Sequence, residues 1–179
     1  MKNKYSTKMI VEAGIMIALA TALSYVKLFQ MPNGGSVTAG STVPLIIFAI
    51  RWGTAPGFLT ALVFGVLQFL LGPKWSFHPV SILFDYVFAY GVVGLSGMFG
   101  KDYIKSIIGI VFAGILRIAS QVISGVVVFA SFAPEGQNVF AYSLIYNATH
   151  LIPELIVAGL LYSMLYKPLT RAKIVEKVA

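Results

Sequence analysis

The sequence contains no cysteine and only six acidic side chains among its 179 residues. Without cysteine, disulfides and thiolate metal sites are excluded. Charged residues make up 11% of the chain and hydrophobic residues 58%, whereas a soluble domain is about 25% charged and about 45–50% apolar. The mean hydropathy of +0.87 agrees with this imbalance. The shortage of charge therefore predicts an integral membrane protein in a lipid bilayer.

Sequence motifs of common enzymes are missing as well. The chain has no GxxxxGK[ST] phosphate loop, no HExxH and no GxSxG. We therefore expect a protein that is not an enzyme and carries no cofactor. If it moves a ligand uphill, another subunit or an ion gradient must supply the energy.

The apolar runs predict an all-α bundle of six transmembrane helices in a single domain, residues 1–179. A span needs about 20 residues, so the length leaves room for short loops only. The expected helices are 7–28, 37–50, 55–71, 79–99, 104–132 and 140–166. The second is short and contains Pro44, so we expect it to be tilted, kinked or partly extended. The basic start followed by an apolar run resembles a signal peptide, but five more apolar segments favour an uncleaved helix.

The basic residues predict the orientation. The net charge of +7 could suggest nucleic acid, but these residues lie in the gaps between apolar runs. Ten fall at the termini and in the 2–3 and 4–5 connections: Lys2, Lys4, Lys8, Arg51, Lys101, Lys105, Lys167, Arg171, Lys173 and Lys177. The alternate loops contain only Lys27 and Lys74. By the positive-inside rule, both termini are expected in the cytoplasm of a multi-pass cell-membrane protein that binds no nucleic acid.

Polar side chains inside the expected spans form three faces at helical spacing. Such residues are costly in lipid and usually face the bundle interior. One face combines His78, Ser81 and Asp85, with Tyr86 beside them; a second combines Arg117, Ser120, Gln121 and Ser124; a third combines Ser143, Asn147, His150 and Glu154, with Tyr142 and Tyr146 alongside.

The orientation places the acid and several aromatic residues of these faces in the outer half of the membrane. Asp85, Phe129, Tyr142, Tyr146 and Asn147 fall at one depth there. Converging polar and aromatic faces describe a pocket toward the exterior. A carboxylate among aromatic rings suits a flat heteroaromatic ligand, and a cation in particular.

Some of these residues have alternative interpretations. Arg117 either pairs structurally with Asp85 or Glu154 or has a functional role. Ser120 and Ser124 are either helix-packing or ligand contacts. His150 and Glu154 alone do not make a metal site, so no metal is expected. Gly14, Ala18 and Ala22 recur at four-residue spacing, which allows close helix approach either inside the bundle or with a partner protein.

Four segments resemble a known family. They are "MPNGGSVT" (31–38), "VPLIIFAIRWG" (43–53), "HPVSILFDYVFAYGVVGLSGMFG" (78–100) and "FAPEGQNVFAYSLIYNATHLIPE" (132–154). Together they are similar to the thiamine-specific substrate-binding (S) component of energy-coupling factor (ECF) transporters. The resemblance implies a six-helix protein that holds thiamine near the outer face. It also implies a partner module of one transmembrane coupling protein and two ATPase subunits.

The resemblance also implies roles for particular residues. Asp85 corresponds to the family's binding acid and is followed by Tyr86. Tyr142 and Asn147 correspond to pyrimidine contacts, Phe129 to a stacking aromatic residue, and Trp75 to an aromatic residue of the 3–4 loop. His78, Gln121 and Tyr146 complete the expected binding set. Gly14, Ala18 and Ala22 correspond to the small residues that dock on the coupling protein.

Two departures from the family pattern leave the ligand open. Gln121 stands where a histidine is expected, and Gly35 where some members have tryptophan. A glutamine still donates and accepts hydrogen bonds, but with altered geometry. The ligand is therefore expected to be thiamine, or else a precursor or related heteroaromatic. Two alternatives are an autonomous secondary transporter with Asp85, Arg117 and Glu154 as a proton relay, and an intramembrane enzyme using His150 and Glu154.

Overall fold

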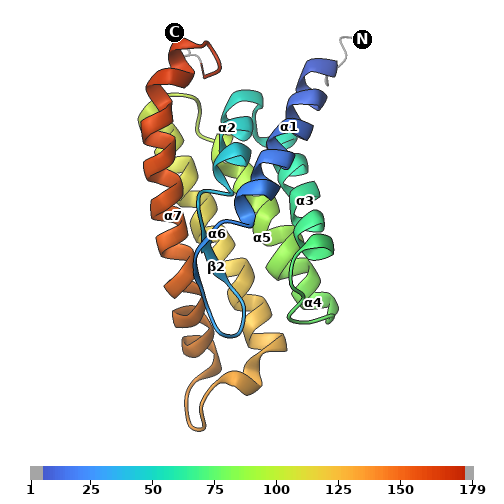
Figure 1. Cartoon of the computed structure of the whole chain (residues 1–179). Helices are drawn as coiled ribbons and strands as arrows, with labels where there is room; N and C mark the ends of the chain where they lie inside the picture. Colours follow the sequence, from blue (N-terminus) through green and yellow to red (C-terminus); the bar gives the residue numbers. More distant parts are fainter. Residues whose placement is uncertain (1–5, 176–179) are drawn as a thin grey trace.

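The computed structural model describes residues 6–175 as a bundle of helices that run roughly side by side, with one small hairpin (Figure 1). Five helical segments are long and apolar enough to cross a membrane, and a shorter apolar helix accompanies them. The long segments are α1 (Thr7–Ser24), α3 (Thr54–Leu71), the run Pro79–Gly97, α6 (Tyr103–Val128) and α7 (Val139–Arg171); the short one is α2 (Val43–Trp52). The predicted all-α membrane bundle is confirmed.

The connection between α1 and α2 differs from the expected one. The first helix ends at Ser24 and not at 28, and the second begins at Val43 and not at 37. Between them, β1 (Lys27–Gln30) and β2 (Ser36–Thr38) pair as an antiparallel hairpin. Gly34 and Gly35 make its turn with φ of 97° and 86°, values that residues other than glycine rarely adopt.

α2 is the most deeply buried element. All its residues from Val43 to Ile50 are buried, and Pro44 lies in the first helical turn, where its missing N–H costs nothing. Ten residues at about 1.5 Å each reach only about half of a 30 Å hydrocarbon layer. The hairpin precedes α2 in the chain. Its first strand is exposed along its whole length, whereas Val37 and Thr38 of the second strand are buried.

The run Pro79–Gly97 is helical throughout but irregular. It comprises α4 (Pro79–Ser81), a π-helical turn η1 (Ile82–Val87), α5 (Phe88–Gly91) and a 3₁₀ stretch η2 (Val92–Gly97). Single π-helical turns inside helices are frequent at functional sites. Asp85 lies within this turn.

The last two helices also differ at their ends from the expected ranges. α6 stops at Val128 and is followed by a separate 3₁₀ turn, η3 (Ala130–Phe132). α7 continues to Arg171 and has 33 residues, about 50 Å, so it extends beyond the hydrocarbon layer.

The start of α1 and the end of α7 lie at the same end of the bundle (Figure 1). This arrangement agrees with two termini on one side of the membrane, the side with the excess of basic residues. Lys2, Lys4 and Lys177, which contribute to that excess, lie outside the described residues. The far end of the bundle contains the hairpin turn, the start of α4, the end of α6 and the start of α7.

Candidate ligand-binding site

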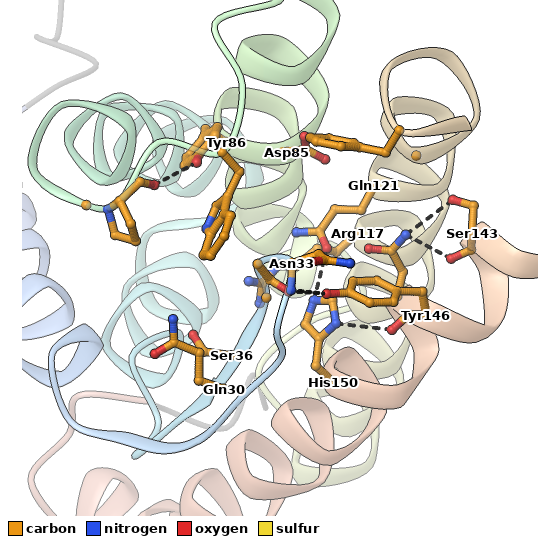
Figure 2. A pocket seen from close by; sticks show the side chains of 18 of the residues that line it. Gln30, Asn33, Ser36, Asp85, Tyr86, Arg117, Gln121, Ser143, Tyr146 and His150 are labelled. Atoms are coloured by element: carbon orange, nitrogen blue, oxygen red, sulfur yellow. Dashed lines mark hydrogen bonds between the residues drawn. The ribbon is translucent and has the colours of Figure 1, made fainter. Parts of the chain in front are cut away.

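A cavity opens in this far half of the bundle (Figure 2). Its accessible volume is about 170 Å³, far more than one ordered water needs. The hairpin, the 3–4 loop, η1, α5, α6, η3 and α7 all contribute to its wall. The lining residues are Lys27, Gln30, Asn33, Gly34, Gly35, Ser36, Gln68, Gly72, Pro73, Trp75, Asp85, Tyr86, Tyr90, Arg117, Gln121, Gly125, Phe129, Phe132, Tyr142, Ser143, Tyr146, Asn147 and His150.

Asp85 is held by two serine hydroxyls. Ser81 Oγ and Ser124 Oγ both donate to its Oδ2, each at 2.6 Å. Ser120 Oγ, one helical turn from Ser124, donates to the carbonyl of Phe84 at 2.7 Å. No ion pair to Asp85 occurs within residues 6–175. The carboxylate therefore lines the cavity without a basic side chain of the described residues as its partner.

Aromatic rings form two sides of the cavity. Phe129 and Phe132 stack with centroids 5.7 Å apart at the end of α6, and Tyr142 and Tyr146 lie 6.0 Å apart on α7. The Nδ2 of Asn147 donates to the Ser143 carbonyl at 2.9 Å, which leaves the amide oxygen available for a ligand donor. These residues offer flat apolar faces together with a hydrogen-bond acceptor.

The hairpin turn covers part of the cavity and is tied to α7. Tyr146 Oη accepts from the Asn33 N–H at 3.1 Å and donates to the Gly34 carbonyl at 2.9 Å. A side chain at Gly34 would collide with Trp75, and one at Gly35 with His150. The absence of side chains at this turn therefore lets Trp75 and His150 approach the hairpin backbone.

A buried ion pair lies at the bottom of the cavity. Arg117 Nη1 is 3.2 Å from Glu154 Oε2, and the guanidinium lies over the Tyr90 ring at 4.5 Å. Thr38, the last residue of β2, and Ser41 both donate to Glu154 Oε1. Of the two pairings considered for Arg117, the structure therefore shows the one with Glu154.

Asp85 and the ion pair do not form one chain of titratable groups. Oδ2 of Asp85 bonds to two serines, while the oxygens of Glu154 bond to Arg117 and to the hydroxyls of Thr38 and Ser41. His150 contacts Gln121 at 3.2 Å and makes no bond to Glu154. Neither the proton relay nor the paired use of His150 and Glu154 has a connected geometry among the described residues.

The structure gathers most of the residues expected for binding around this cavity. Trp75, Asp85, Tyr86, Gln121, Phe129, Tyr142, Tyr146 and Asn147 all line it. His78 does not: it is exposed and its Nδ1 caps the start of α4 by accepting from Val80 N–H at 3.2 Å. The prediction grouped His78 with Ser81 on one helical face, but the helix begins only at Pro79, so His78 precedes it.

Sequence analysis missed the contribution of the hairpin to this site. Lys27, Gln30, Asn33 and Ser36 line the cavity, but the sequence predicts helices over 7–28 and 37–50 with only a loop between them. The Pro-Asn-Gly-Gly run at 32–35 is a turn signal that would have indicated the hairpin. Tyr90 and Gly125 also line the cavity but are not in the predicted set, although each lies one helical turn after a predicted residue, Tyr86 and Gln121.

Gly14, Ala18 and Ala22 lie on the outside of the bundle. All three are exposed, and a methyl group added at Gly14 would meet no atom within 4 Å. The four-residue spacing therefore does not serve packing inside this bundle. It gives α1 a smooth outward strip on which another helix can approach closely.

Comparison with known proteins identifies related sequences and structures with the same fold. The family model described as thiamine transporter protein (Thia_YuaJ) matches residues 10–174. The thiamine transporter ThiT of Bacillus subtilis (strain 168) is 37% identical over 88% of this chain and 89% of its own. The protein of the same name from Lacticaseibacillus paracasei is 30% identical over 77% of this chain and 76% of its own.

Two solved structures share the fold. A ThiT from Listeria monocytogenes superposes with a TM-score of 0.79 at 24% identity, covering 93% of this chain and 96% of that one. The S component of a bacterial ECF transporter superposes with a TM-score of 0.65 at 18% identity, covering 93% and 97%. At these identities the likeness supports the arrangement of helices.

Proposed function

This chain belongs to the thiamine transporter protein family, and we propose that it is the substrate-binding S component of an ECF-type vitamin transporter, with thiamine as its ligand. The observation that carries the proposal is the carboxylate of Asp85, which has no ion-pair partner among residues 6–175, in a cavity with aromatic walls. Thiamine combines a flat neutral aminopyrimidine with a thiazolium ring of fixed positive charge. The site offers a complementary group for each half.

The thiazolium is placed beside Asp85. In a site shielded from water, the attraction between a carboxylate and a fixed cation is stronger than in bulk solvent. The pyrimidine is placed between the rings of Phe129 and Tyr142, with its amino group toward Asn147. Tyr86 and Trp75 close the site from the side of the 3–4 loop, and the whole chain acts as one transmembrane domain.

Gln121 is proposed to contact the ligand from the side of α6. Its bond to His150 fixes the amide at 3.2 Å, so one polar atom of the amide is engaged and the other remains for the ligand. This geometry suits an aminopyrimidine, and it also fits a pyrimidine precursor without the thiazolium. The charge on Asp85 favours thiamine between the two.

The energy for uptake is proposed to come from a module of two ATPase subunits and a transmembrane coupling protein. The outward strip of Gly14, Ala18 and Ala22 on α1 is the proposed docking surface for the coupling protein. Within the bundle no helix covers this strip among the described residues, so a helix of a partner protein can pack on it. It lies on a different face of the bundle from the cavity, so ligand binding and docking can be disturbed separately.

Calorimetric titration of the purified protein tests the proposed ligand. Thiamine should bind tightly, and Asp85→Asn should weaken it about 30-fold or more, because removing one partner of a desolvated charge pair costs about 2–5 kcal/mol. The matched control ligand is an uncharged analogue with carbon in place of the thiazolium nitrogen, which should lose little. If a bare pyrimidine binds the wild type as tightly as thiamine does, the ligand is a precursor and the assignment of thiamine fails.

A further inference from the structure

Hydroxyl groups on the helices of this chain differ in the partner to which they donate. Four bond back to the carbonyl four residues earlier on their own helix, as Ser and Thr commonly do in helices. Those bonds run from Thr21 to Ile17, Thr149 to Ile145, Ser163 to Gly159 and Thr170 to Tyr166, at 2.7–2.9 Å. Ser81 and Ser124 do not follow the pattern, because both donate to the side chain of Asp85.

The two serines bond the same oxygen of the carboxylate. Both distances to Oδ2 are 2.6 Å, within the range of charge-assisted O–H···O⁻ bonds. Ser81 is on the same helical run as Asp85, and Ser124 reaches across from α6. Both hydroxyls are shielded from solvent, at 1% and 0% exposure. Within residues 6–175 no protein group bonds Oδ1, so one oxygen is left for the cavity.

The backbone that carries Asp85 is held by the same face of α6. Ser120 donates to the carbonyl of Phe84, the residue before Asp85, within the π-helical turn. Ser120 and Ser124 are four residues apart on α6, so both point toward the π-helical segment that contains Asp85. Three hydroxyls therefore fix the position of Asp85 before any ligand arrives, and binding needs no reorganisation of the acid.

We propose that Ser81 and Ser124 are positioning residues that hold Asp85 with a single open oxygen, and so select an organic cation whose charge is not on paired N–H groups. This inference rests on the proposed function and deepens it. A guanidinium or amidinium requires both carboxylate oxygens for its two parallel hydrogen bonds, and Oδ2 is already occupied. A thiazolium has no N–H at its charged nitrogen and needs only the nearby negative charge.

The test measures binding of two ligands to matched serine variants of the full chain in detergent. Ser124→Ala and Ser81→Ala should each weaken thiamine binding about tenfold, because each loses a hydrogen bond to a charged group. The uncharged analogue with carbon in place of the ring nitrogen should change by less than about twofold. Ser163→Ala is the control, because its hydroxyl bonds the Gly159 carbonyl and lies outside the cavity lining.

A double-mutant cycle separates positioning from packing. In the Asp85→Asn background, Ser124→Ala should cost thiamine less than about twofold, because the charge that the serine supports is already gone. Equal losses for the charged and uncharged ligands, or a full tenfold loss in the Asp85→Asn background, would overturn the inference. Thermal unfolding of each variant shows whether it is folded. If Ser124→Ala does not fold, the ligand comparison is made with Ser81→Ala.

Two failures are distinguishable. If wild-type protein does not bind thiamine, the proposed function is wrong and this inference falls with it. If wild-type protein binds thiamine and discriminates against the uncharged analogue, and the serine variants bind both ligands as the wild type does, only the inference is wrong. Binding of benzamidine, an amidinium, as tightly as thiamine would also overturn it, because that ligand requires both oxygens of Asp85.

Discussion

The wall of the cavity and the outward face of α1 are held in contrasting ways. In the cavity, side chains from elements far apart in the sequence bond one another: Ser124 to Asp85, Arg117 to Glu154 and Tyr146 to the hairpin turn. In α1, only Met9 and Ala20 are buried. Its polar links to the rest of the bundle are the Glu12–Arg51 ion pair at 3.3 Å and the Gln68–Ser24 bond at 3.0 Å.

This difference assigns separate tasks to the two regions. A network of buried polar bonds fixes side-chain positions, which a selective ligand site needs. A lightly attached helix with small outward residues can be covered by a partner without disturbing that network. Substitutions in the cavity should therefore alter ligand binding or stability, and substitutions on α1 should alter only assembly.

The largest expected effect is on assembly. Ala18→Leu puts a bulky side chain on the outward strip of α1, so close approach of a partner helix is prevented. Thiamine uptake by cells that co-express the ATPase and coupling subunits should fall to background. Calorimetric binding of thiamine by the purified variant should be unchanged, because Ala18 is exposed and remote from the cavity lining.

Ala18→Ser is the control for this substitution, since it keeps the residue small and should preserve uptake. Loss of thiamine binding by purified Ala18→Leu would break the separation between the two regions. That result would mean that α1 packs against the cavity elements more closely than its exposure indicates.

The next largest effect compares the two ion pairs directly. Glu154→Gln leaves the Arg117 guanidinium charged and buried without its partner, which typically costs about 3–5 kcal/mol. Glu12→Gln is the matched control in α1, where both partners keep partial exposure of 15% and 19%, and its cost should be below about 1 kcal/mol. Thermal unfolding in detergent measures both. Equal destabilisation by the two substitutions would contradict the contrast between the regions.

The helical parts of the fold and site were predictable from sequence because each depends on local periodicity. Asp85, Tyr142 and Asn147 lie on polar faces that the helical spacing predicts, and these faces line the cavity. The apolar runs also gave the long spans to within a few residues at most ends.

The parts that sequence reasoning missed depend on tertiary contacts. The sequence predicts a helix over residues 37–50, yet Val37 and Thr38 pair with β1. Thr38 also bonds to Glu154 of α7, a contact with a distant part of the chain that leaves no local signal. The π-helical turn at Asp85 has no local signal, since serines of α6 bond to it from 36 and 39 residues away in sequence. The choice of Glu154 over Asp85 as the partner of Arg117 likewise depends on how α6 and α7 pack.

The smallest expected effect concerns the bond between the cavity wall and the hairpin. Tyr146→Phe removes the hydroxyl that accepts from Asn33 and donates to Gly34, while the ring keeps its packing against Tyr142 and His150. Each such neutral bond contributes about 1 kcal/mol net, and the freed backbone groups at the cavity mouth regain water. A total of about 1 kcal/mol should raise the dissociation rate of thiamine about fivefold.

The association rate should stay nearly the same, because a looser hairpin obstructs entry no more than a bonded one. Stopped-flow fluorescence can follow both rates through Trp75, which lines the cavity beside Gly34. Tyr25→Phe is the control, since Tyr25 is 64% exposed and outside the cavity lining. If Tyr146→Phe slows association and leaves dissociation unchanged, the hydroxyl acts on the path into the cavity. The hairpin would then not belong to the network that holds the bound ligand. Only the helices of the cavity wall, and not the hairpin, would then differ from α1 in this respect.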